Sequence, residues 1–347
     1  MNNFLLVDDE DINFIWETIQ EQQIVFHPYI APDGKFDYKK FLSYQHNKPL
    51  ILIIDRNILS SLLKFCEKGL LKNKAESQIV GLIMAWADLN NIQISAGLAI
   101  QERATQLNSQ EEGLIELQKF LETFDEYPSQ MWLYVAEGKL TEIQPITFSN
   151  KPAENITANY ASGNDHYYMA LASLLHIIQL YRNKSMKPAE KLQEFFQWSY
   201  DNLLICEYLL IYAALLFVGA EDIKAPKHAN SNDFDKIILG CENQAWDTAY
   251  LTIWSTFYSD PEYCKEEFLL ATNDVLLKRI FINRNGPNGW LGVLNAAFLE
   301  KDYNKICDFV EEKMQNRVKP DFGPNPKEYF LKLIEKEKKQ ISDLLLK

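Results

Sequence analysis

The sequence predicts an α/β fold in which a parallel sheet carries helices on both faces, together with a large all-helical insertion. The first observation is a run of five apolar residues, 50–54, which is rich in isoleucine and ends abruptly at Asp55. Such continuous runs are typical of strands that are buried on both faces, as in parallel sheets. The second observation is that strand and helix patterns alternate near both ends of the chain, which favours a parallel α/β sheet.

The N-terminal third contains most of the predicted strands. An amphipathic pattern with acids in its first turn predicts a helix over 8–23, because those acids suit the helix dipole. Residues 27–49 hold several prolines and many aromatics and are interpreted as an irregular connection. The elements expected next are strands over 50–54 and 91–95 and helices over 57–71, 75–89 and 96–107.

The rest of the chain is predicted to be mainly helical until a last strand near the C-terminal quarter. The elements expected there are helices across 109–220 with a loop at 138–155, a polar connection over 221–234, a helix over 235–258, a strand over 268–272, a helix that begins at Asp274 and a short strand over 279–282. Three segments follow: an N-terminal helical and irregular extension (1–49), an α/β core with C-terminal helices (50–108 and 235–347) and a helical insertion (109–234).

Composition sets the broad class of the protein. The chain has 347 residues, of which 47% are hydrophobic and 24% charged, and this is ordinary for a folded soluble protein. The net charge of -13 lowers the expectation of extensive contact with a nucleic-acid duplex, because such proteins usually carry a basic face. A local basic rim remains compatible with this total.

Cysteine usage and the apolar segments indicate a cytoplasmic protein. The five cysteines are widely spaced and include no CxxC pair, so neither a disulfide framework nor a zinc knuckle is predicted. The N-terminus lacks the pattern of a signal peptide. The most apolar run, 203–219, is short for a membrane span and contains Glu207, so a buried core helix is favoured and no membrane association is expected.

Four acids stand out by their position in these elements. Asp55 and Asp274 each follow a predicted strand at its carboxyl end, where open parallel sheets place their ligand crevice. Glu102 and Asp247 lie in predicted helices on the same face as apolar neighbours. Buried carboxylates are costly unless a cation, a metal or hydrogen bonds compensate them, and oxygen ligands suit Mg²⁺ and Mn²⁺.

The sequences around these acids resemble the PIN-like nuclease superfamily, and their order along the chain matches that family. The segments that carry the resemblance are LILIIDRNIL (50–59), SAGLAIQERA (95–104), ENQAWDTAYLTIW (242–254) and ATNDVLLKR (271–279). The resemblance extends over roughly 50–107 and 235–285. It departs from compact members of the family in the long stretch between the second and third acids, which is expected to form a lid, a protein-partner surface or an RNA-binding lobe.

The resemblance implies a PIN-like core with metal-dependent hydrolysis of phosphodiester bonds, with RNA preferred over DNA. Mg²⁺ or Mn²⁺ would be held or oriented by Asp55, Glu102, Asp247 and Asp274. Asn57 and Thr272 would lie beside the substrate and support the strand ends through hydrogen bonds. A toxin, an RNA-processing enzyme and a defence effector are all compatible with the nuclease activity that the resemblance implies.

Three basic residues near the last acid are predicted to bind phosphates of the substrate because of their position, and no family motif supports them. They are Lys278, Arg279 and Arg284.

Each acid also has a purely structural interpretation. Asp55 and Asp274 are suited to cap the helices that follow them. Glu102 is also compatible with a solvated helix position paired with Arg103 or Gln106, and Asp247 with an ion pair to a lysine across a helix interface. At the level of the whole chain, the alternative is a non-catalytic PIN-like or helical scaffold that binds protein partners, and a third possibility is a small-molecule phosphoesterase. The chain has no GxxxxGK[ST], GxGxxG or GxSxG motif, which disfavours nucleotide-binding enzymes of those classes and serine hydrolases.

Overall fold

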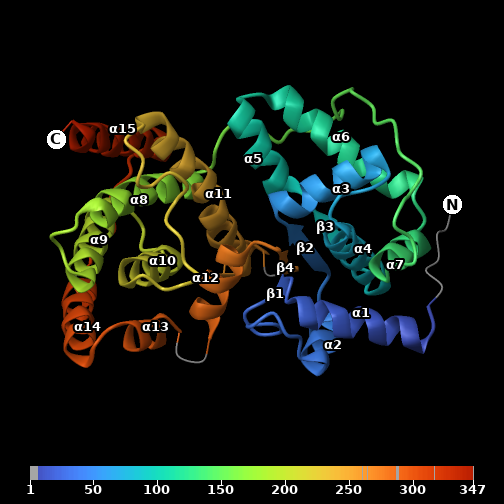
Figure 1. Cartoon of the computed structure of the whole chain (residues 1–347), viewed down its shortest axis with the longest axis horizontal. Helices are drawn as coiled ribbons and strands as arrows, with labels where there is room; N and C mark the ends of the chain where they lie inside the picture. The colour runs from blue at the N-terminus through green and yellow to red at the C-terminus, as the bar shows by residue number, and fades with distance from the viewer. Residues whose placement is uncertain (1–6, 260, 264, 287–288, 316, 347) are drawn as a thin grey trace. The chain divides into compact units, whose positions relative to one another are not determined.

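The computed structural model of the protein describes residues 7–259, 261–263, 265–286, 289–315 and 317–346 (Figure 1). The chain divides into two compact units, each of which is built from two segments. Unit 1 comprises Met1–Gly163 and Trp254–Asp274, and unit 2 comprises Asn164–Ile253 and Val275–Lys347.

A mixed sheet forms the centre of unit 1. Its described strands are β1 (Val25–Phe26), β2 (Leu50–Ile54), β3 (Gln93–Ser95) and β4 (Glu267–Ala271), in the spatial order β1-β4-β2-β3. β2 is parallel to both β3 and β4, so the strands predicted at 50–54 and 268–272 both form and lie next to each other in the sheet. β1 pairs antiparallel with β4, and the prediction of an entirely parallel sheet is therefore wrong at this edge. A strand of two residues is too short to leave an alternating pattern in the sequence.

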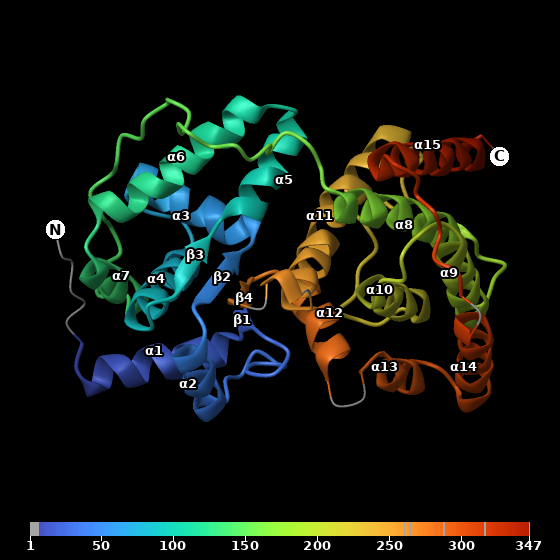
Figure 2. The ribbon, with the colours of Figure 1, turned by 180° about the vertical axis from the view of Figure 1, so that it is seen from behind.

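Helices α1 to α7 of unit 1 surround these strands, and the end of α11 (Phe234–Ser259) also belongs to the unit. The surrounding helices are α1 (Asp9–Gln22), α2 (Tyr38–Asn47), α3 (Arg56–Lys68), α4 (Lys74–Leu89), α5 (Gly97–Leu107), α6 (Gln110–Glu126) and α7 (Ser129–Ala136). In Figures 1 and 2, α3, α5 and α6 lie on one side of the strands, and α1 and α2 lie on the other. The apolar core includes Leu52, Ile54 and Leu269 from the sheet together with Trp86 from α4. The fold is thus α/β in the broad sense.

Two elements of unit 1 differ from the prediction. α2 lies inside the segment predicted to be irregular, where Asp37 accepts the backbone N–H of Lys40 and caps the helix. Residues 109–163, predicted as part of the helical insertion, belong to unit 1. They are held there by α6, which packs against α3 and α5.

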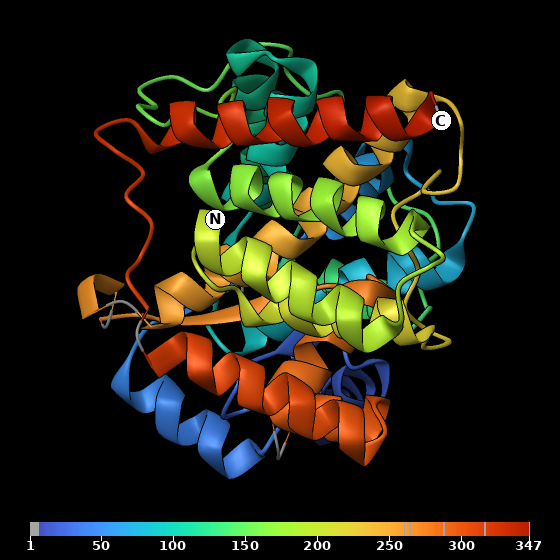
Figure 3. The same ribbon diagram turned by 90° about the vertical axis from the view of Figure 1, so that its left-hand side faces the viewer.

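All the regular secondary structure described in unit 2 is helical, and loops such as 219–233 and 317–325 connect the helices. It contains α8 (Asp165–Arg182), α9 (Pro188–Asn202), α10 (Glu207–Val218), the first part of α11 (Phe234–Ser259), α12 (Val275–Asn285), α13 (Gly289–Ala297), α14 (Glu300–Gln315) and α15 (Pro326–Leu345). Figure 3 shows α15 running alongside α8, and the two helices pack closely. The C-terminal helices therefore join the helical unit, whereas the predicted segments assigned them to the α/β core.

Two further predictions concern helices of unit 2. The strand predicted over 279–282 is wrong, because these residues lie within α12. Leu277, Ile280 and Phe281 of α12 are buried, and this helical spacing explains the apolar residues that suggested a strand. The apolar run near 203–219 forms α10, whose residues are mostly buried. Among the described helices, none is long and apolar enough to span a membrane.

Candidate functional site

Asp55 lies at the junction between β2 and α3. Its backbone N–H donates to the carbonyl of Ala271 at 3.0 Å, which continues the pairing between β2 and β4. Its side chain is 2% exposed, and Oδ1 accepts the backbone N–H of Ile58 at 2.8 Å. Asp55 is thus the N-cap of α3, as its structural interpretation expects.

A hydrogen-bonded chain connects Asp55 to the end of β4. The Thr272 hydroxyl donates to Asp55 Oδ2 at 2.5 Å, and Thr272 Oγ1 accepts the backbone N–H of Asp274 at 3.0 Å. Thr272 is buried, while Asp274 is partly exposed. The structure therefore brings together three of the residues singled out from the sequence, at the carboxyl ends of two neighbouring parallel strands.

The electrostatic setting of Asp55 disfavours its ionised form. Burial raises the pKa of Asp55 to about 6, against hydrogen bonds from Thr272 and Ile58 that act to lower it. The negative charge of Asp274 raises this pKa further. Capping alone does not require such a charge, since α4 is capped by Asn73 and α6 by Ser109.

Two other predicted residues also belong to unit 1. Glu102 lies in α5 and is 8% exposed, and its Oε1 accepts a hydrogen bond from the side chain of Gln106 at 3.2 Å. This burial departs from the alternative of a solvated helix position. Asn57 lies in the first turn of α3 with its side chain exposed.

The remaining predicted residues belong to unit 2. Asp247 lies in the part of α11 that belongs to this unit and is partly buried. Lys278, Arg279 and Arg284 lie in α12. The side chain of Arg279 pairs with Asp222 at 2.5 Å, and that of Arg284 pairs with Glu207. Both arginine charges are therefore compensated by carboxylates of unit 2.

The donor chemistry at the end of β2 and β4 fits a hard cation. Within the described ranges, no group of three or more histidine, cysteine, aspartate or glutamate side chains is arranged to hold a metal ion. Mg²⁺, however, is commonly bound through only one or two carboxylates, with waters and substrate phosphates completing the shell. Asp55 and Asp274, whose charges interact, are two carboxylates at this edge of the sheet.

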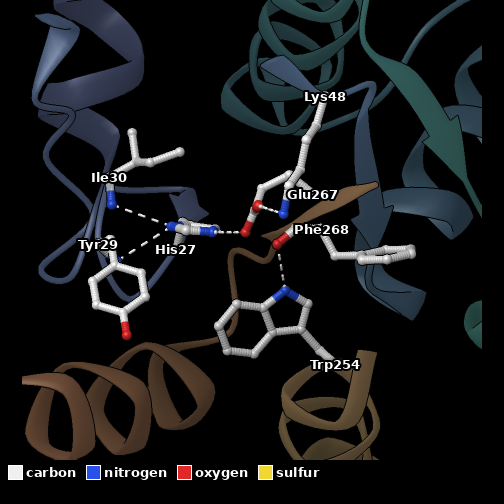
Figure 4. Close-up of polar contacts among 7 residues, drawn as sticks. All are labelled: His27, Tyr29, Ile30, Lys48, Trp254, Glu267 and Phe268. Carbon is white, nitrogen blue, oxygen red and sulfur yellow. Dashed lines mark hydrogen bonds and ion pairs between the residues drawn. The ribbon is translucent and has the colours of Figure 1, made fainter. Parts of the chain in front are cut away.

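A second buried polar cluster, which the sequence did not indicate, lies at the opposite end of β4 (Figure 4). His27 is fully buried, and its Nε2 lies 2.8 Å from Oε1 of Glu267, the first residue of β4. Lys48 Nζ donates to the other oxygen of Glu267 at 3.3 Å. The three residues are far apart in the sequence. The only local signal is an acid at the start of an apolar strand.

The hydrogen bonds of His27 define its role. Nδ1 accepts the backbone N–H groups of Tyr29 and Ile30, both at 3.2 Å, so the proton is assigned to Nε2, which donates to Glu267. Burial raises the pKa of Glu267, but the hydrogen bonds from His27 and Lys48 outweigh it, and the pKa lies below its ordinary value. Both ring nitrogens of His27 are therefore hydrogen-bonded within unit 1, and the cluster links the start of β4 to the segment that follows β1.

Comparison of the chain with protein-family models, with curated proteins and with solved structures finds no match in any of the three. The interpretation of the carboxylate site therefore rests on its own chemistry.

Proposed function

We propose that the protein is a divalent-metal-dependent nuclease with a PIN-like core in unit 1, and that it hydrolyses phosphodiester bonds of RNA in preference to DNA. The observation that carries the proposal is the state of Asp55. A buried carboxylate with a raised pKa and a second carboxylate nearby costs stability, and the capping of α3 does not need it. Residues kept at a cost to stability are most often found at functional sites.

In this proposal, Asp55 and Asp274 hold Mg²⁺ or Mn²⁺. The bound ion would activate a water molecule and stabilise the charge that develops on the phosphate. Thr272 donates its hydroxyl to one oxygen of Asp55, and the Ile58 amide fixes the other, so the carboxylate is held in one orientation. With a pKa of about 6, Asp55 is mostly ionised at neutral pH and is able to bind a cation.

Two further acids complete the proposed set. Glu102 follows β3, the neighbour of β2, and its burial is typical of a carboxylate with a specific role. The fourth acid of the set predicted from the sequence, Asp247, belongs to unit 2. The ion pairs of Arg279 and Arg284 weigh against a role for these two side chains in phosphate binding.

A non-catalytic scaffold that binds protein partners is the second candidate. It is favoured by one observation, that each oxygen of Asp55 already accepts a hydrogen bond within unit 1. In that case the carboxylate would only join β2, β4 and α3.

Cleavage of end-labelled single-stranded RNA and DNA in Mn²⁺ or Mg²⁺ tests the proposal. We expect the wild type to cut RNA faster than DNA, and Asp55→Asn and Asp274→Asn to abolish cutting, as EDTA does. Asp37→Asn is the matched control, because Asp37 also caps a helix of unit 1 but is exposed, and it should cut normally. Cutting that survives in both site variants would refute the assignment, and no metal-dependent cutting by the wild type would favour the scaffold.

A further inference from the structure

A separate pocket of unit 1 lies between α3, α5 and α6, and its volume is about 450 Å³. Its polar lining includes Arg56, Ser60 and Lys64 of α3, Arg103 of α5 and Lys119 of α6. We call it the α3–α6 pocket. Pockets of this size are typical of small-molecule sites.

The basic residues of the α3–α6 pocket fall into two groups. The Arg56 guanidinium is held by Glu116 through two hydrogen bonds of 2.5 and 2.8 Å, so its charge is compensated and its position is fixed. Within the part of the chain that the structure describes, Lys64, Arg103 and Lys119 form no ion pair with a carboxylate. The positive charge of the pocket therefore depends on these three side chains.

The acids in the lining do not cancel this charge. Glu116 is committed to Arg56, which leaves Glu67 and Glu112 against the three remaining cations. The pocket thus carries a local positive excess in a chain whose net charge is -13. A positive, concave site of this kind attracts anions, and arginine and lysine together are typical of phosphate recognition.

The other walls of the pocket are apolar. Leu63, Ile115 and the buried Phe148 form this apolar part, and Lys119 Nζ lies 6.0 Å from the centre of the Phe148 ring. The lining also includes Gln106, whose side chain donates to Glu102. The α3–α6 pocket thus combines cations for a phosphate with an apolar wall for a flat, less polar group. A polynucleotide is less well matched, since neutralising many phosphates requires a longer basic surface than one pocket provides.

We propose that the α3–α6 pocket binds a small phosphorylated molecule of the nucleotide class. Lys64 and Arg103 are exposed at its edge and are assigned to the phosphate. The apolar wall at Phe148 is assigned to the base. The proposal stands on the geometry of the pocket and does not depend on nuclease activity.

Isothermal titration of the full chain with the four ribonucleoside 5′-monophosphates tests this, in EDTA so that metal-dependent cutting plays no part. We expect at least one to bind with Kd below about 1 mM. Lys64→Glu and Arg103→Glu should each weaken binding by about tenfold or more, because each replaces a charge-assisted contact with repulsion. Lys68→Glu, an exposed position on α3 outside the pocket, is the matched control and should bind as the wild type does.

Three further results decide the interpretation. The corresponding nucleoside and inorganic phosphate should each bind more weakly than the monophosphate, since each uses half of the pocket. Failure of all four monophosphates to bind, or equal weakening in Lys68→Glu, would overturn the proposal. So would binding of a single-stranded RNA oligonucleotide that depends on Lys64 and Arg103 when no monophosphate binds. Circular dichroism of each variant checks folding, and Lys64→Ala and Arg103→Ala replace any charge reversal that does not fold.

Discussion

The buried carboxylates near the two ends of β4 have pKa values shifted in opposite directions. At its start, Glu267 receives hydrogen bonds from His27 and Lys48, and its pKa is lowered (Figure 4). Near its other end, Asp55 accepts hydrogen bonds from the Thr272 hydroxyl and the Ile58 amide, lies near a second carboxylate, and has a pKa raised to about 6. Among the residues that the structure describes, Glu267 has cationic and histidine partners, whereas the hydrogen bonds to Asp55 come from neutral groups. The comparison singles out Asp55 as the buried carboxylate whose presence is not explained by a contribution to stability.

The largest expected effect on stability comes from removing the Glu267 carboxylate. Glu267→Leu should lower the free energy of unfolding by about 3 kcal/mol or more, because it leaves the Nε2–H of buried His27 without its acceptor and removes the partner of Lys48. Urea unfolding at neutral pH measures the change. Glu266→Leu, at the exposed neighbouring position, is the control. A loss of less than about 1 kcal/mol would mean that Glu267 is not held by this cluster.

Asp55→Asn should stabilise the protein at neutral pH, whereas Glu267→Leu destabilises it. Between the ordinary value of 3.8 and the folded pKa of about 6, the folded state binds more protons than the unfolded state, so stability falls as pH rises through this window. Asparagine keeps the cap without the charge, and we expect it to stabilise the protein at pH 7 by on the order of 2 kcal/mol.

Urea unfolding in EDTA at pH 4, 5, 6 and 7 follows this effect. The gain should shrink towards pH 4, where Asp55 is protonated in the folded state. Asp37→Asn should show no comparable gain at neutral pH. If Asp55→Asn is instead less stable than the wild type at pH 7, the two ends of β4 do not differ as described.

Mn²⁺ should stabilise the folded protein, and this stabilisation should depend on Asp55. At a Mn²⁺ concentration about ten times its dissociation constant, binding to the folded state stabilises it by about 1.4 kcal/mol. The melting temperature of the wild type should therefore rise by about 2 °C, and that of Asp55→Asn should rise less. Equal shifts in the two proteins would place metal binding elsewhere, and the absence of a shift in both would favour the scaffold.

The smallest expected effect concerns the link between the two strands. Thr272→Val should destabilise the protein by about 1 kcal/mol, because it removes the hydroxyl that donates to Asp55. It should also move the Asp55 titration to higher pH, since that hydrogen bond lowers its pKa. Thr272→Ser, which retains the hydroxyl, should restore the titration measured through the pH dependence of stability. If serine and valine behave alike, the hydroxyl is not what positions Asp55.

The parts of the site that could be predicted are those with a strong local pattern. The apolar run at 50–54 predicts a buried strand and places Asp55 at its end, and a similar run predicts β4 and Thr272. The structure makes these strands parallel neighbours that end at the same edge of the sheet, and this brings Asp55 and Thr272 into contact. That adjacency is not predicted from the sequence.

Other parts could not be predicted because their determinants are not local. β1 has two residues and no period, and its partner β4 is distant in sequence. The cluster of His27 and Glu267 depends on that same pairing. The apolar residues of α12 suit a short strand as well as a helix, and only their burial in unit 2 decides between them. Whether Asp247 acts with the acids of unit 1 stays a prediction.

The order of the strands has a consequence for how the chain folds during synthesis. β4 lies between β1 and β2, yet it is translated after the whole of the first segment of unit 2. Until it leaves the ribosome, β1 has no neighbour and one side of β2 is uncovered, so the nascent N-terminal segment carries open strand edges for most of its translation. Closing this sheet is a long-range step, which is characteristically slow and exposes the chain to aggregation. Fragments that end before β4 should therefore depend on chaperones far more than the full chain does.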